Sequence, residues 1–227
     1  MANQTLVDTG ALDLVQGNVD PAAELISALV QPNSGISVVP QSAQFVGRVG
    51  NIADANTAQS ALLNDAGNGP FQLVSFDSTL PTVAFPTHAI LMTNGLANIP
   101  SSNTNTEFDH RAVNGTAPGG TSTSDVALLR SILGDQNKAI NDVNSLKFSF
   151  TVPANGSSVE ADFVFGSDEY PETDVTDIFA FVVDGKNYAV FADNSLVSFQ
   201  KTHEQNFNSN TTNAYGIEYD GISNKLH

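Results

Sequence analysis

The sequence predicts a mostly β protein: an antiparallel β-sandwich (jelly-roll-like or Ig-like) with two or three short peripheral helices. Three observations predict this class. Short apolar segments recur along the chain, Asn-Gly and Asp-Gly pairs suited to tight turns separate some of them, and only two segments have helical signals. No internal repeat is visible, so we expect a single β-rich domain over residues 1–227.

The first element expected is an extended N-terminal arm, residues 1–19. Two short apolar stretches lie in it, Thr5–Val7 and Ala11–Val15, and it contains no Lys or Arg. An extended apolar segment of this kind can add to the open edge of a sheet as an extra strand. We therefore expect the arm to be able to serve as a donated strand.

Two short helices are expected. In the first, Asp20 can cap the N-terminus, Pro21 suits the first helical position, and apolar residues recur on one face up to Val30. The second covers Ser124–Gly134, with a capping residue and an acid at its start and a glycine at its end. Strand-like stretches in the first half are Ile36–Val39, Ala43–Val49, Phe71–Phe76, Thr82–Phe85 and His88–Met92.

The second half of the chain has the clearer strand pattern. Leu146–Val152 and Val159–Phe165 alternate apolar and polar residues on either side of Asn155-Gly156, which predicts a β-hairpin. A second hairpin is expected to turn at Asp184-Gly185. Its strands would be Ile178–Val183 and Tyr188–Phe191, and long surface loops are expected at residues 98–123 and 202–214.

Composition excludes several classes of function. The chain has 8 Lys and Arg against 24 Asp and Glu, a formal net charge of −16, so it lacks the basic clusters that nucleic-acid binding needs. No apolar run is long enough for a membrane span. With no cysteine there is neither a disulfide framework nor a thiolate site. No catalytic or organic-cofactor motif is visible.

The densest chemical feature is the stretch Gly166–Asp177, which we call the acidic segment; it contains five acids and no basic residue. Close carboxylates repel one another unless water or a cation neutralises them. Irregularly spaced carboxylates suit Ca²⁺, which takes six to eight oxygens, although this spacing is not that of an EF-hand loop. The alternatives are a solvated acidic loop and an acid/base pair of a glycoside hydrolase. The candidate metal ligands are Asp168, Glu169, Glu172, Asp174 and Asp177.

A family resemblance rests on this same stretch. Phe163–Glu172 reads Phe-Val-Phe-Gly-Ser-Asp-Glu-Tyr-Pro-Glu, and Asp177–Phe181 reads Asp-Ile-Phe-Ala-Phe. These residues resemble the hallmark turn and following strand of the bacterial choice-of-anchor L domain, and weaker similarities extend the resemblance over residues 20–226. It implies an extracellular or cell-surface module of adhesin-like or matrix proteins, which reach the surface through differing anchors.

The chain departs from the family pattern after Glu218–Gly221, where family members continue into further apolar strands. If those strands are missing, an open sheet edge remains for another chain to pair with. We therefore expect a non-enzymatic structural subunit or adhesin module of a bacterial surface, fibre or biofilm matrix, self-associating by strand donation and stabilised by Ca²⁺. The alternatives are a calcium-dependent module that binds a surface glycan and a polysaccharide hydrolase.

Overall fold

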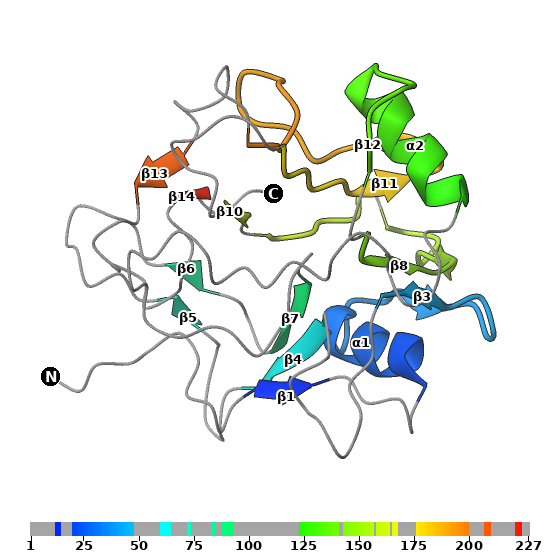
Figure 1. Cartoon of the computed structure of the whole chain (residues 1–227). Coiled ribbons are helices and arrows are strands. Elements are labelled where there is room, and N and C mark those ends of the chain that lie inside the picture. Colours follow the sequence, from blue (N-terminus) through cyan, green and yellow to red (C-terminus); the bar gives the residue numbers. More distant parts are fainter. Residues whose placement is uncertain are drawn as a thin grey trace, which may run out of the picture.

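The computed structural model shows a chain of short antiparallel strands with two helices (Figure 1). None of the helices in the described part is long and apolar enough to cross a membrane. The structure describes residues 12–14, 20–47, 60–64, 72–73, 83–84, 88–92, 123–140, 143–156, 158–163, 165–167, 176–199, 207–209 and 221–223.

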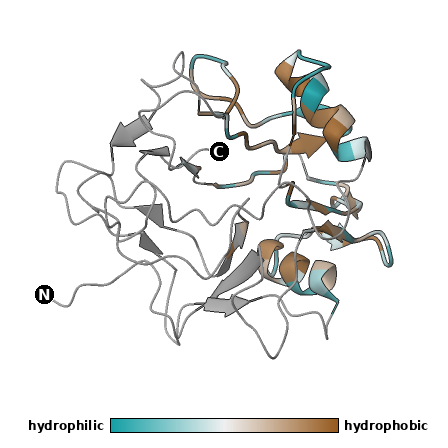
Figure 2. Ribbon diagram, viewed as in Figure 1, coloured by the Kyte–Doolittle hydropathy of each residue, from teal (hydrophilic) through white to brown (hydrophobic). Residues whose placement is uncertain are grey.

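The first helix, α1 (Pro21–Leu29), forms as predicted. The side chain of Asp20 accepts hydrogen bonds from the backbone N–H groups of Ala22 and Ala23, at 3.1 and 3.2 Å. These bonds satisfy two donors that a helix N-terminus otherwise leaves unpaired. Leu25 is fully buried on the inner face of the helix, and Figure 2 shows that both helices combine apolar and hydrophilic residues.

The second helix, α2 (Thr123–Leu133), begins one residue before the predicted start. Gly134 follows it with a φ of 69°, a left-handed conformation that glycine adopts without the steric cost of a Cβ atom. The sequence signals of both helices were therefore read correctly.

Helix α1 packs beside a three-stranded sheet (Figure 1). The sheet contains β1 (Leu12–Leu14), β4 (Ser60–Asn64) and β7 (His88–Met92), in the order β1-β4-β7 and all antiparallel. Strand β7 has its predicted bounds. The strand β4 was not predicted, and β1 lies within the predicted N-terminal arm, where it pairs with β4 of its own chain.

Smaller antiparallel sheets make up the rest of the described strands. Five further predicted strands are present in part: β2 (Ser37–Val38), β3 (Gln44–Val46), β5 (Gln72–Leu73), β6 (Val83–Ala84) and β8–β9 (Ser145–Lys147 and Phe150–Thr151). β2 pairs with β9, and β3 pairs with β8. β5 pairs with β6, and a three-stranded sheet contains β10 (Gly166–Ser167), β14 (Gly221–Ser223) and β13 (Phe207–Ser209) in the order β10-β14-β13.

The predicted hairpin around Asn155-Gly156 is not found among the described residues. Its first half is divided into β8 and β9, which pair with β3 and β2 instead. Residues 158–163 contain no regular strand. The strand partners are therefore 99 to 114 residues away in the sequence, where alternation alone cannot reveal them. Strand β13 lies inside the predicted loop 202–214, and residues 98–122 of the other predicted loop lie outside the described part.

The predicted turn at Asp184-Gly185 is confirmed, but its second strand lies just before the predicted Tyr188–Phe191, and Val190 forms only an isolated bridge with Leu196. β11 (Val182–Val183) pairs with β12 (Lys186–Asn187), and the two turn residues between them, Asp184 and Gly185, have φ values of 49° and 79°. Two positive φ angles in a two-residue loop define a type I′ turn, whose twist matches that of the flanking strands.

Residues that precede and follow this hairpin in the sequence belong to an aromatic core. Phe191 is 4% exposed, while Val197 and Phe199 are fully buried. All of its members have odd numbers, as expected when alternate residues of extended segments share a face. Ala189, Phe163, Phe165, Phe179 and Phe181 complete the cluster. The described part is thus mostly β with two helices, and its packing as a sandwich stays a prediction.

Candidate functional site

The C-terminal end of the acidic segment is anchored to the aromatic core. The backbone N–H of Phe199 donates to the carbonyl of Asp177 at 2.9 Å, and the N–H of Phe179 donates to the carbonyl of Val197 at 2.9 Å. Since Val197 and Phe199 are fully buried, these bonds attach the backbone of Asp177 to the buried core. Asp177 itself is only partly buried.

The two ends of the acidic segment are joined by a side-chain hydrogen bond. Ser167 is 1% exposed and lies in β10, where it pairs with Gly221 of β14. Its Oγ donates to Oδ2 of Asp177 at 2.7 Å. A carboxylate offers about four lone-pair sites on its two oxygens, and this bond orients the group. The geometry closes the base of the segment.

A lysine also lies at this base. The Nζ of Lys138 is 3.5 Å from Oγ1 of Thr176, the neighbour of Asp177. Arg130, near the end of α2, donates from Nε to the carbonyl of Lys138 at 2.8 Å and so helps to position the turn that carries the lysine. Sequence reasoning missed Lys138, because it lies 38 residues before Thr176 and no local pattern links the two.

Of the five predicted metal ligands, the structure places Asp177. Among the described residues, no group of three or more His, Asp or Glu side chains is arranged to hold a metal ion. This statement does not extend to the other four predicted ligands, which lie outside the described part: Asp168, Glu169, Glu172 and Asp174. The calcium site therefore stays a prediction.

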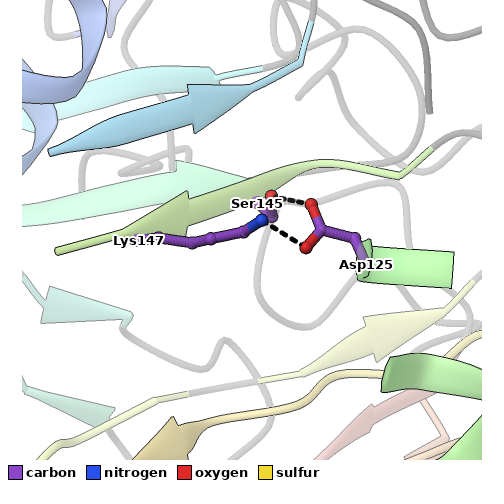
Figure 3. Close-up of polar contacts among 3 residues, drawn as sticks. All are labelled: Asp125, Ser145 and Lys147. Atoms are coloured by element: carbon purple, nitrogen blue, oxygen red, sulfur yellow. Dashed lines mark hydrogen bonds and ion pairs between the residues drawn. The ribbon is translucent and has the colours of Figure 1, made fainter. Parts of the chain in front are cut away.

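A second polar cluster joins α2 to β8 (Figure 3). Asp125, in the first turn of α2, is 5% exposed. Its Oδ2 accepts a hydrogen bond from Ser145 Oγ at 2.9 Å, and its Oδ1 forms an ion pair with Lys147. A buried carboxylate needs such partners, and its place in the first helical turn also suits the helix dipole. The cluster connects two elements and presents no open group for chemistry.

The choice-of-anchor L domain model matches residues 30–226, which is nearly the whole chain, and the chain belongs to this family. It is thus a surface-associated extracellular module, of a family that is surface-anchoring and is not a known enzyme family. No curated protein and no solved structure matches the chain. The predicted resemblance, drawn from the residues around the acidic segment, is confirmed.

Proposed function

We propose that the chain is a structural or adhesive module of a bacterial surface, fibre or biofilm matrix, without enzymatic activity, that associates with copies of itself by strand donation. The observation that carries this proposal is the terminal strand β1, three residues long, which occupies the edge of β4. Short edge strands such as β1 join a sheet through backbone hydrogen bonds, and such bonds can also form between chains. Membership of a surface-associated family supports the same function.

Calcium binding in the acidic segment is the second part of the proposal. Asp177 would supply one carboxylate, held in place by Ser167, and Asp168, Glu169, Glu172 and Asp174 would supply the others. Lys138 offsets at most one of these five negative charges. A divalent cation would offset two more, and it would connect the two ends of the segment. The closed base of the segment supports this arrangement.

A calcium-dependent glycan-binding module is the alternative, and one feature of the hairpin favours it. Tyr188 is 50% exposed, and the Nζ of Lys186 lies 4.6 Å from the centre of its ring. An exposed aromatic ring can stack on a sugar, and the chain has no Trp to do so. A glycan module of this kind would act as a monomer and would lose binding when Tyr188 is changed to Ala.

Self-association tests the proposed function directly. Size-exclusion chromatography with light scattering, followed by negative-stain electron microscopy, should show a mass that rises with protein concentration and then linear assemblies. Added salt should promote them, because it screens the repulsion between copies that each carry a charge of −16. A chain that stays monomeric over the whole concentration range, in calcium and in salt, would contradict the proposal and favour the glycan alternative.

A further inference from the structure

The sheet β1-β4-β7 has one central strand and two outer strands. β4 is its central strand, with β7 on one side and β1 on the other. The pairing of β1 is short and regular: Leu12 lies opposite Leu63, Asp13 opposite Leu62 and Leu14 opposite Ala61. Among the described strands β1 pairs only with β4. Among the described residues, Leu12–Leu14 are the ones that pair along this edge of β4.

These strands are also nearly free of charge. Asp13 is the only acidic residue in β1, β4 and β7, and none of the three contains Lys or Arg. The chain as a whole has a formal net charge of −16. Two copies repel each other over most of their surfaces, and this repulsion is weakest where uncharged strands meet. The β4 edge is a suitable place for contact between copies.

The connection between β1 and α1 limits how β1 reaches its own sheet. Residues 15–20 separate Leu14 from Pro21, where α1 begins, and six residues span at most about 20 Å. Helix α1 packs on β7 and β4, so the tether keeps β1 close to its own β4 edge. The effective concentration of β1 at that edge is then of the order of millimolar, and the β1 strands of other copies compete with it more strongly as their concentration rises.

We propose that the edge of β4 is the acceptor site for the β1 strand of a second copy, with Leu12–Leu14 of one chain paired to Ala61–Leu63 of the next in the register observed within one chain. This strand exchange rests on the proposed self-association, with β1 as the donor strand and the edge of β4 as the acceptor. The same backbone pairs form within and between chains, so the two states differ mainly in which copy supplies β1 and in association entropy. Donation from each copy to the next builds an open, linear assembly.

The absence of cysteine makes disulfide trapping a clean test. Two single variants, Leu12→Cys and Leu63→Cys, are prepared separately, one with an affinity tag, and are mixed at assembling concentration before mild oxidation. Directly opposite residues of an antiparallel pair have Cα atoms about 4.5–5.5 Å apart, which lies within the disulfide range. We expect a tagged–untagged disulfide dimer on a non-reducing gel, in an amount that rises with concentration.

The matched control mixes Asp13→Cys with Leu63→Cys. Asp13 lies one position out of register with Leu63, and successive residues of a strand project from opposite faces of the sheet, so these cysteines cannot form a disulfide without a shift in register. The control should give several-fold less mixed dimer. Circular dichroism melts of each variant verify that the substitutions leave the fold in place.

Two results would overturn the inference, and they are distinguishable. If the mixture assembles but yields no more mixed dimer than the control, self-association stands and donation of β1 to β4 fails. The double variant Leu12→Cys/Leu63→Cys should then form its disulfide within one chain, even inside the assembly. If no mixture assembles at any concentration, the proposed function fails, and strand exchange fails with it.

Discussion

Asp125 keeps a carboxylate in the protein interior, and its two partners explain how. Ser145 donates to one oxygen and Lys147 pairs with the other, so neither oxygen is left without a partner (Figure 3). The side chain of Lys147 is 37% exposed and so keeps part of its hydration. The two residues of the pair therefore differ in what their replacement leaves behind. Without Asp125, water can still solvate Lys147, whereas without Lys147 the carboxylate of Asp125 stays buried without its cationic partner.

This arrangement gives a prediction for the pair. Asp125→Ala should lower the free energy of unfolding by about 1–3 kcal/mol, since Ser145 and Lys147 lose a charged partner. A double-mutant cycle with Lys147→Met, followed by urea unfolding, should show a coupling of at least roughly 0.5 kcal/mol. As a control, Asp125→Ala with Lys186→Met, an exposed lysine of the hairpin, should be additive. If the changes in the free energy of unfolding are additive for both pairs, the ion pair between Asp125 and Lys147 contributes nothing to stability.

Residue-level reasoning from the sequence succeeded where the signal was local. Asp20 and Pro21 defined the start of α1 because a cap and its helix are adjacent in the chain. Asp177 was singled out by its acidic neighbours, but its link to Ser167 was not, since a hydrogen bond across ten residues leaves no pattern. Lys138 was missed for the same reason at a longer range.

At the level of elements, the hairpin β11–β12 shows the strongest local determination. Asp184 and Gly185 both adopt positive φ, and the Asp-Gly pair is one that such turns prefer. A Cβ atom added at Gly185 would meet nothing within 4 Å. Any cost of substitution there is therefore a backbone cost, free of steric clashes with neighbouring residues.

Gly185→Ala should accordingly destabilise the protein by roughly 1–2 kcal/mol, the cost of placing a Cβ atom in the left-handed region. The measurement is the urea midpoint of unfolding. Asp184→Gly provides the control, because glycine tolerates the φ of 49° and should leave stability nearly unchanged. If Gly185→Ala is as stable as the parent protein, the turn does not have the type I′ conformation in solution.

The other elements show why strand pairing is harder to predict than strand content. β4 (Ser60–Asn64) has no apolar–polar alternation, so its sequence gives no strand signal. It forms because β7 and β1 provide partners on both sides. β8 and β9 were predicted as parts of one strand of a hairpin with a near neighbour, yet β3 and β2 pair with them. Such long-range partners depend on the packing of the whole chain.

For the whole molecule, charge is the dominant feature. The formal net charge of −16 comes from 24 acids against 8 basic residues, and the five predicted metal ligands are concentrated within ten positions, residues 168–177. A net charge of this size destabilises a compact state through self-repulsion and keeps copies apart. Any cation bound in the acidic segment would reduce both the self-repulsion within one chain and the repulsion between copies. The family could be recognised from the sequence of this segment, whereas the positions of its carboxylates in space could not be predicted from it.

The most direct test of the account is the melting temperature of the chain in millimolar calcium and in chelator at equal ionic strength. If calcium binds the folded chain at a hundred times its dissociation constant, stability rises by about 2.7 kcal/mol, which for this size is roughly 5–10 °C. Asp177→Asn should lose most of that rise, while Asp184→Asn, which removes the same charge from the exposed hairpin turn, should keep it. Equal melting temperatures in calcium and chelator would contradict the proposed calcium site in the acidic segment.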